Sequence, residues 1–146
     1  MSLPNGRRIA IDVGTVRNGL AISDQLGITA NPVGSFSEDD LLAKIMVMHQ
    51  EGPIVTVYVG LPLHLSGVEG ESAKLARALA RKVAELEVAP VHLVDERLTS
   101  RTAQGNQAGI EEFGLDALAA VEILKFALAG ELNRGVRFGK PLELGS

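Results

Sequence analysis

The sequence predicts an α/β fold in which a mixed β-sheet is covered by helices on both faces. Hydrophobic residues make up 46% of the 146 residues and aromatic residues only 3%, which indicates a core of Val, Leu, Ile and Ala. Apolar patterns follow the order strand, strand, strand, helix, strand, helix, strand, helix, which is typical of such a sheet. The length favours a single domain over residues 1–146.

The N-terminal segment predicts a β-hairpin. Residues 8–13 and 19–23 are two apolar runs joined by a short turn that begins at Gly14, and a weaker third strand is predicted at residues 27–29. Asp12 lies near the end of the first run. Because an unpaired carboxylate is costly in apolar surroundings, we expect Asp12 to face a cation or hydrogen-bond donors.

The middle of the chain predicts two helices around a buried strand. Ser37 can cap a helix that runs to about Gln50, and acidic residues occupy its first turn. Residues 54–59 are almost continuously apolar, as in a buried parallel strand. Residues 71–87 carry apolar side chains at helical spacing, which predicts an amphipathic helix.

The C-terminal third predicts a short strand at residues 91–94 and a long helix at residues 115–132. A further helix is predicted to start near Ser100. Residues 133–146 are polar and contain glycine, so they are expected to include a flexible tail.

Three acid-bearing segments form the candidate site. Asp12 lies near the end of the first predicted strand, Glu96 follows the strand predicted at residues 91–94, and Asp116 opens the last helix. Sites in open α/β sheets form at the carboxyl ends of strands, so these acids could meet. Three carboxylates can hold one or two Mg²⁺ or Mn²⁺ ions, and two ions about 3.5–4 Å apart can activate water and stabilise the leaving oxygen of a phosphodiester.

Each acid also has a structural interpretation. Asp12 could cap the turn after its strand, Asp116 could be an ordinary helix-start residue, and Glu96 could form a surface pair with Arg97. Only the three acids together favour a metal site. The chain has no cysteine, which excludes thiolate ligands and leaves oxygen or histidine ligands.

Four segments, in order along nearly the whole chain, resemble the YqgF family. These bacterial proteins are described as pre-16S ribosomal RNA nucleases or Holliday-junction resolvase-like enzymes. The segments are residues 11–24, residues 59–63 with 70–77, residues 94–100, and residues 116–120 with 123–124. Four collinear motifs are far more specific than one. The resemblance implies a ribonuclease-H-like fold, with a mixed five-stranded sheet and helices on both faces.

The resemblance also implies a site and an activity. It assigns catalysis and the binding of Mg²⁺ or Mn²⁺ to Asp12, Glu96 and Asp116. It assigns phosphate binding or ordering of the site to Thr15, Arg17 and Arg97. The implied activity is metal-dependent hydrolysis of phosphodiester bonds in structured RNA during pre-16S rRNA maturation, with branched DNA at a Holliday junction as the alternative substrate.

Two departures from the family pattern predict weaker substrate binding and slower cleavage. Only 20 positions separate Glu96 from Asp116, and residues 105–114 contain no basic residue where the family carries a longer, basic segment. The central loop reads His64-Leu65-Ser66, where the family has an Asn-containing polar run.

Bulk properties and two rival functions complete the expectations. A net charge of −4 argues against a protein that coats nucleic acid nonspecifically. No apolar run could span a bilayer and no signal peptide is evident, so we expect a cytoplasmic protein without membrane contact; no pattern predicts an oligomeric state.

One rival function is that of a non-catalytic nucleic-acid- or ribosome-binding factor. The other is a fragment of an actin-like phosphotransferase, because residues 12–15 followed by a hairpin resemble its phosphate loop, although 146 residues cannot supply its two domains.

Overall fold

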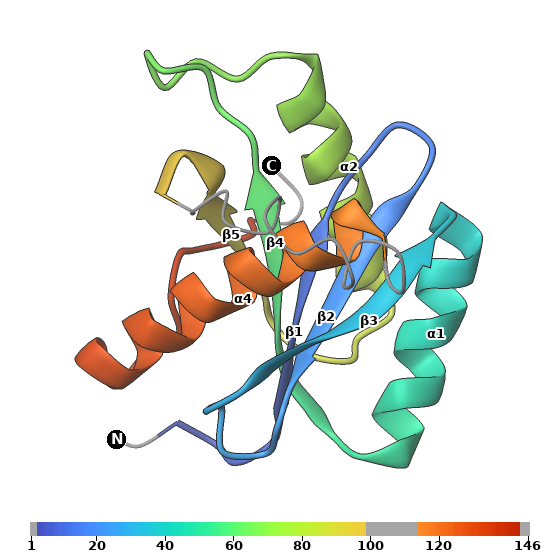
Figure 1. Cartoon of the computed structure of the whole chain (residues 1–146), viewed down its shortest axis with the longest axis vertical. Coiled ribbons are helices and arrows are strands. Elements are labelled where there is room, and N and C mark those ends of the chain that lie inside the picture. Colours follow the sequence, from blue (N-terminus) through green and yellow to red (C-terminus); the bar gives the residue numbers. More distant parts are fainter. Residues whose placement is uncertain (1–2, 99–113, 144–146) are drawn as a thin grey trace.

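The computed structural model describes residues 3–98 and 114–143. These residues form a single sheet with helices on both faces (Figure 1). The strands are β1 (Arg7–Asp12), β2 (Asn18–Ser23), β3 (Ala30–Phe36), β4 (Ile54–Leu61), β5 (Val91–Asp95) and β6 (Lys140–Pro141). The helices are α1 (Glu38–Glu51), α2 (Glu71–Glu85), the 3-10 helix η1 (Glu96–Leu98) and α4 (Leu115–Arg134).

The sheet has the strand order β3-β2-β1-β4-β5-β6. Strands β1, β2 and β3 form an antiparallel meander, β4 and β5 run parallel to β1, and β6 is antiparallel to β5. The carboxyl ends of β1, β4 and β5 therefore meet at one edge. This edge is where the sequence analysis expects a site.

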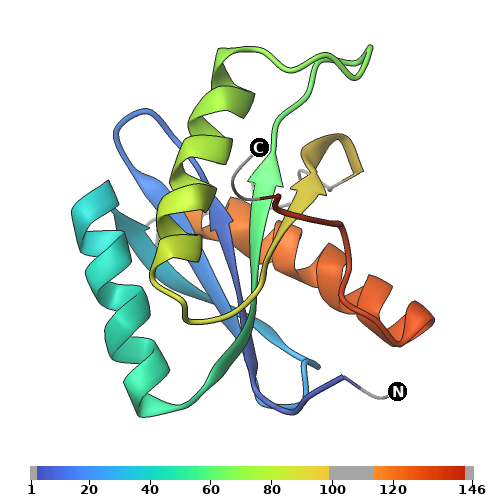
Figure 2. The same ribbon diagram turned by 180° about the vertical axis from the view of Figure 1, so that it is seen from behind.

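The two faces of the sheet have different chemistry because successive side chains point to opposite sides. Ile9 and Ile11 of β1 belong to the larger core cluster, which also contains residues of α1 and α2. Ala10 belongs to the second cluster, under α4. Figures 1 and 2 show α4 crossing one face and α1 and α2 covering the other. Small residues such as Ala10 and Ala21 let α4 lie close to the strands.

The expected fold class is confirmed, but the predicted strand count and one strand position are wrong. The sheet has six strands instead of five, and the third spans Ala30–Phe36 instead of residues 27–29. Pro32 and Gly34 obscured this strand in the sequence, since both residues argue against a central strand. They are tolerated because β3 lies at the sheet edge, where a missing N–H is not needed by a further strand.

The three long helices match the sequence prediction to within about two residues, the usual uncertainty of helix ends. The helix predicted to start near Ser100 lies outside the described residues. The polar segment from residue 133 contributes the end of α4 and the short strand β6. Within the described part of the chain, no helix is long and apolar enough to cross a membrane.

Candidate active site

Asp12 is the last residue of β1 and lies between two glycines of the adjacent strands. It pairs with Gly19 of β2, and the pairing of Ile11 with Val59 brings Asp12 beside Gly60 at the next step of β4. Its side chain is half-buried. Because Ile11 belongs to the core on the α1 and α2 side, Asp12 faces α4. Asp12 therefore stands in a row of three positions whose other two lack side chains.

Gly60 makes room for the carboxylate of Glu96. A Cβ atom at residue 60 would lie 2.4 Å from Oε1 of Glu96 and 2.6 Å from Cδ1 of Ile123 in α4. Both distances are far shorter than any ordinary contact of a Cβ atom. The carboxylate of Glu96 thus lies directly over β4, on the same face of the sheet as Asp12 and next to it in the strand order.

Gly19 makes room for the backbone of Asp116. A Cβ atom at residue 19 would lie 1.9 Å from the carbonyl oxygen of Asp116, so the first turn of α4 rests on β2. The hydroxyl of Ser35, which pairs with Gly19 from β3, donates a hydrogen bond of 3.4 Å to Oδ2 of Asp116. The start of α4 is held where its acid can face the end of β1.

The structure therefore brings the three predicted acids to one edge of the sheet. We call Asp12, Glu96 and Asp116, with Gly19 and Gly60, the acid edge. Within residues 3–98 and 114–143, no group of three His, Cys, Asp or Glu side chains is arranged so that it could hold a metal ion. The donor set nevertheless fits Mg²⁺ or Mn²⁺, since both ions take carboxylate oxygens. Gly60 leaves room for the carboxylate of Glu96, and Gly19 leaves room for the backbone of Asp116.

Asp95 and Glu96 are adjacent in sequence but belong to different elements and make different contacts. Asp95 ends β5 and Glu96 starts η1. The guanidinium of Arg97 donates to Asp95, with Nη2 2.6 Å from Oδ2, and this pairing holds the pKa of Asp95 below its usual value. Asp95 therefore forms an ion pair with Arg97, whereas the carboxylate of Glu96 lies over Gly60.

Arg97 ties two loops of the acid edge together. Besides Asp95 it contacts the carbonyl oxygen of Leu65, to which its Nη1 donates a hydrogen bond of 3.1 Å. This link connects η1 to the loop after β4. The resemblance implies phosphate binding or ordering of the site for Arg97, and both roles stay predictions.

Thr15 and Arg17 lie in the turn between β1 and β2, and both are exposed. The backbone N–H of Gly14 donates to Oδ1 of Asn18, which closes the turn. Nη1 of Arg17 lies 3.4 Å from the carbonyl oxygen of Ser35. Both residues lie in the turn that follows the strand end carrying Asp12.

Sequence reasoning missed Ser35 and the contact roles of Gly19 and Gly60. The two glycines lie inside strands that pair on both sides. A glycine in a strand interior often marks close approach of a ligand or another backbone, and that signal was present in the sequence. Ser35 gave no comparable signal, because its strand was predicted elsewhere.

Comparisons with known proteins agree with this architecture. The family model RuvX, described as Holliday junction resolvase, matches residues 6–130. A protein of Rhodococcus erythropolis named "Putative pre-16S rRNA nuclease" is 42% identical over 151 residues, which cover 92% of this chain and 84% of the relative. A protein of Streptomyces avermitilis with the same name is 38% identical over 99% of both chains.

One solved structure has a similar fold. The structure of T. thermophilus RuvC in complex with a Holliday junction substrate matches with a TM-score of 0.56 and 15% identity, and the match covers 93% of this chain and 99% of RuvC. At this identity the match concerns the fold alone, and it confirms the expected ribonuclease-H-like architecture.

Proposed function

Since the chain belongs to the RuvX family, the YqgF family of the sequence motifs, we propose that it is a metal-dependent nuclease that cuts structured RNA in the maturation of 16S rRNA. The observation that carries this proposal is the glycine row. Gly60 and Gly19 admit the carboxylate of Glu96 and the helix start of Asp116 on either side of Asp12. The names of the curated relatives support the RNA substrate.

The three acids would hold the metal, and their carboxylate oxygens are the ligands that Mg²⁺ and Mn²⁺ prefer. Asp12, Glu96 and Asp116 supply oxygen ligands from β1, η1 and α4, which are separate elements fixed by the core. When bound, Mg²⁺ or Mn²⁺ supplies an activated water and stabilises the departing oxygen. Ser35 orients the carboxylate of Asp116, and Arg17 is placed to position a phosphate.

Two alternative functions can be distinguished from the proposed one by experiment. The family description favours a four-way DNA junction as a second substrate of the same site. A non-catalytic binder would hold structured RNA equally well with and without Mn²⁺ and cut nothing. An rRNA substrate would place the activity in the cytoplasm.

The Asp12→Asn variant tests the proposal, because it removes a ligand charge without changing shape. We expect Mn²⁺-dependent cleavage of an RNA that carries the 16S precursor end to fall by about 100-fold or more. Asp39→Asn, in the exposed first turn of α1, is the matched control and should cleave like the wild type. A four-way DNA junction is assayed beside the RNA, with EDTA as the metal-free arm.

The readout decides between the alternatives. Circular dichroism spectra must show that both variants are folded. Wild-type cleavage rates in Asp12→Asn, in a preparation free of contaminating nuclease, would remove Asp12 from the site. Cleavage of the junction with no cleavage of the RNA would replace the proposed substrate.

A further inference from the structure

Aliphatic side chains project into solvent beside each strand end of the acid edge. Val16 follows Asp12 in the β1–β2 turn and is 78% exposed, while Leu65 and Val68, in the loop after β4, are 95% and 59% exposed. Leu98 and Leu115 are also exposed. Single exposed aliphatic residues are ordinary, but several around one candidate site suggest a contact surface.

The loop that carries Leu65 and Val68 is held in place by its own contacts. Leu63 bridges to Glu69, and the backbone N–H of His64 donates to the carbonyl oxygen of Val68 over 3.0 Å. The Arg97 side chain also binds the carbonyl oxygen of Leu65. Figure 1 shows this loop reaching beyond the end of the sheet. The exposed side chain of Leu65 therefore sits on a braced loop tip.

The charges of this rim do not suit binding through phosphates. Arg97 is paired with Asp95, and Arg77 is paired with Glu69 through contacts of 2.7 and 2.6 Å. These pairings raise the pKa of Arg77 and lower that of Glu69, so both groups stay charged and neutralise each other. Arg17 is an exposed cation beside Asp12. Within residues 3–98 and 114–143, the rim therefore offers few unpaired cations and would release few counterions when it binds nucleic acid.

We propose that Val16, Leu65 and Val68 contact the faces of unpaired bases next to the scissile phosphate. The substrate would then be recognised through splayed nucleotides and not through the backbone of a duplex. Apolar side chains pack against bases and wedge between them, and duplex regions do not expose base faces. This inference rests on the proposed function, because it places the reacting phosphate at the acid edge.

The test measures binding without cleavage, so that it does not depend on turnover. The probes are a fluorescent RNA hairpin with a single-stranded flank and a blunt duplex with the same number of phosphates, each titrated in Ca²⁺ by anisotropy. Leu65→Ser is compared with Leu132→Ser. Leu132 is 87% exposed near the end of α4, far along the helix from Asp116, and is the matched control.

We expect Leu65→Ser to weaken binding of the flanked hairpin by about tenfold, a loss consistent with one buried leucine side chain, and binding of the duplex by less than about twofold. Leu132→Ser should change neither. The logarithm of the wild-type affinity should fall with the logarithm of salt concentration with a slope of about −1, as for one or two phosphate contacts.

Two results would overturn the inference. One is equal weakening of both RNAs by Leu65→Ser, or no weakening of either, because contact with unpaired bases requires that only the flanked hairpin bind more weakly. The other is a wild-type preference for the duplex with a steep salt dependence. Neither result bears on Asp12→Asn, so the nuclease proposal and this inference fail separately.

Discussion

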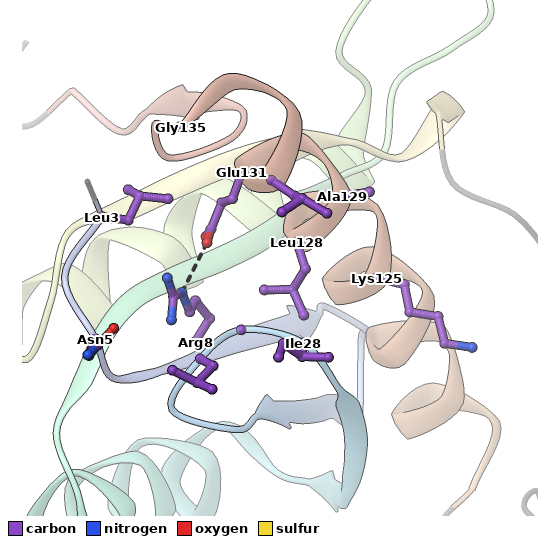
Figure 3. A pocket seen from close by; sticks show the side chains of 12 residues that line it. Leu3, Asn5, Arg8, Ile28, Lys125, Leu128, Ala129, Glu131 and Gly135 are labelled. Atoms are coloured by element: carbon purple, nitrogen blue, oxygen red, sulfur yellow. Dashed lines mark hydrogen bonds and ion pairs between the residues drawn. The ribbon is translucent and has the colours of Figure 1, made fainter. Parts of the chain in front are cut away.

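The two ends of α4 carry carboxylates in opposite environments. Near its C-terminus, Glu131 is 5% exposed and accepts a 3.0 Å hydrogen bond from Nε of Arg8, while the hydroxyl of Tyr58 donates to its other oxygen. The backbone N–H of Phe138 donates in turn to the hydroxyl of Tyr58. Burial and the bond to Glu131 both raise the pKa of Tyr58, which keeps it a donor. Figure 3 shows the ion pair between β1 and α4.

The other end of the same helix lies roughly 22 Å away and places Asp116 at the acid edge. There the carboxylates are half-buried, and two glycines make room for the side chain of Glu96 and the backbone of Asp116. At the Glu131 end, the protein supplies the balancing charge from Arg8. A buried acid with an internal cation holds the fold together, whereas the acids at the sheet edge would take their balancing charge from a bound metal ion under the proposed function.

The Glu131 end of α4 also borders a pocket of about 520 Å³, which Arg8 and Glu131 help to line. Aliphatic side chains such as Leu128 and Ile28 line most of it (Figure 3). The guanidinium of Arg8 is occupied by Glu131 and by the carbonyl oxygens of Gly6 and Gln25. The ionic groups at this pocket therefore hold the fold together, and the pocket does not compete with the acid edge as the reaction site.

Removing Glu131 should have the largest effect on stability. Glu131→Ala leaves Arg8 buried without its counter-charge, and we expect a loss of about 3–5 kcal/mol in the free energy of unfolding by urea. Glu85→Ala is the matched control, because Glu85 occupies the last turn of α2 but is exposed. Equal stability of the two variants would show that the Arg8–Glu131 pair is not a structural anchor.

Two glycine substitutions separate structure from chemistry at the acid edge. A Cβ atom at residue 19 meets the backbone of Asp116, so Gly19→Ala should displace α4 and cost about 1–3 kcal/mol. At residue 60 it meets side-chain atoms of Glu96 and of the buried Ile123 instead of backbone, so Gly60→Ala should cost less stability than Gly19→Ala. The cleavage rate of Gly60→Ala should fall by about 100-fold, because Glu96 is displaced.

Urea titrations and cleavage assays on both variants check this pair. A Gly60→Ala protein with full activity would show that the position of Glu96 is unimportant. A Gly19→Ala protein with unchanged stability would show that the close contact between α4 and β2 does not constrain the helix.

The sequence predicted the elements that carry the acids but not the contacts that bring them together. Strands β1 and β5 were recognisable from apolar runs, and a site that uses the acids at their carboxyl ends followed from the general location of sites in such sheets. The buried Glu131 was not foreseen, because its partners lie in strands distant in sequence. A glutamate in the last turn of an apolar helix is a weak hint, and choosing Arg8 and Tyr58 as its partners needs the strand register.

Strand β6 shows a second limit of the sequence. It is two residues long, includes Pro141 and pairs only with β5, so it has no periodicity to recognise. What places it is tertiary contact. Ring Nδ1 of His92 lies 2.8 Å from the carbonyl oxygen of Phe138, and Phe138 packs over Gly130 of α4.

Binding of Mn²⁺ at the acid edge should raise the free energy of unfolding. At Mn²⁺ concentrations of ten times Kd, a single site raises the free energy of unfolding by about 1.4 kcal/mol. We expect this gain in the wild type and its loss in Asp12→Asn, measured by thermal unfolding. Without metal, Asp12→Asn should be at least as stable as the wild type, because one of the gathered charges is gone. An equal Mn²⁺ shift in both proteins would place the bound metal away from Asp12.

The smallest effect is a pH dependence at the Glu131 end. His92 lies edge-on to Tyr58, with ring centroids 6.3 Å apart, and burial lowers its pKa below the usual 6.5. The unfolded chain therefore takes up a proton at a higher pH than the folded chain does. The stability that His92 contributes is complete above pH 6.5 and declines as the pH falls through the lowered pKa of the folded state. His92→Gln should flatten the fall in urea midpoint between pH 7 and pH 5, while leaving Mn²⁺ binding unchanged. An unaltered slope would show that His92 takes up its proton in the folded protein as readily as in the unfolded chain. Burial beside Tyr58 would then not lower the pKa of His92.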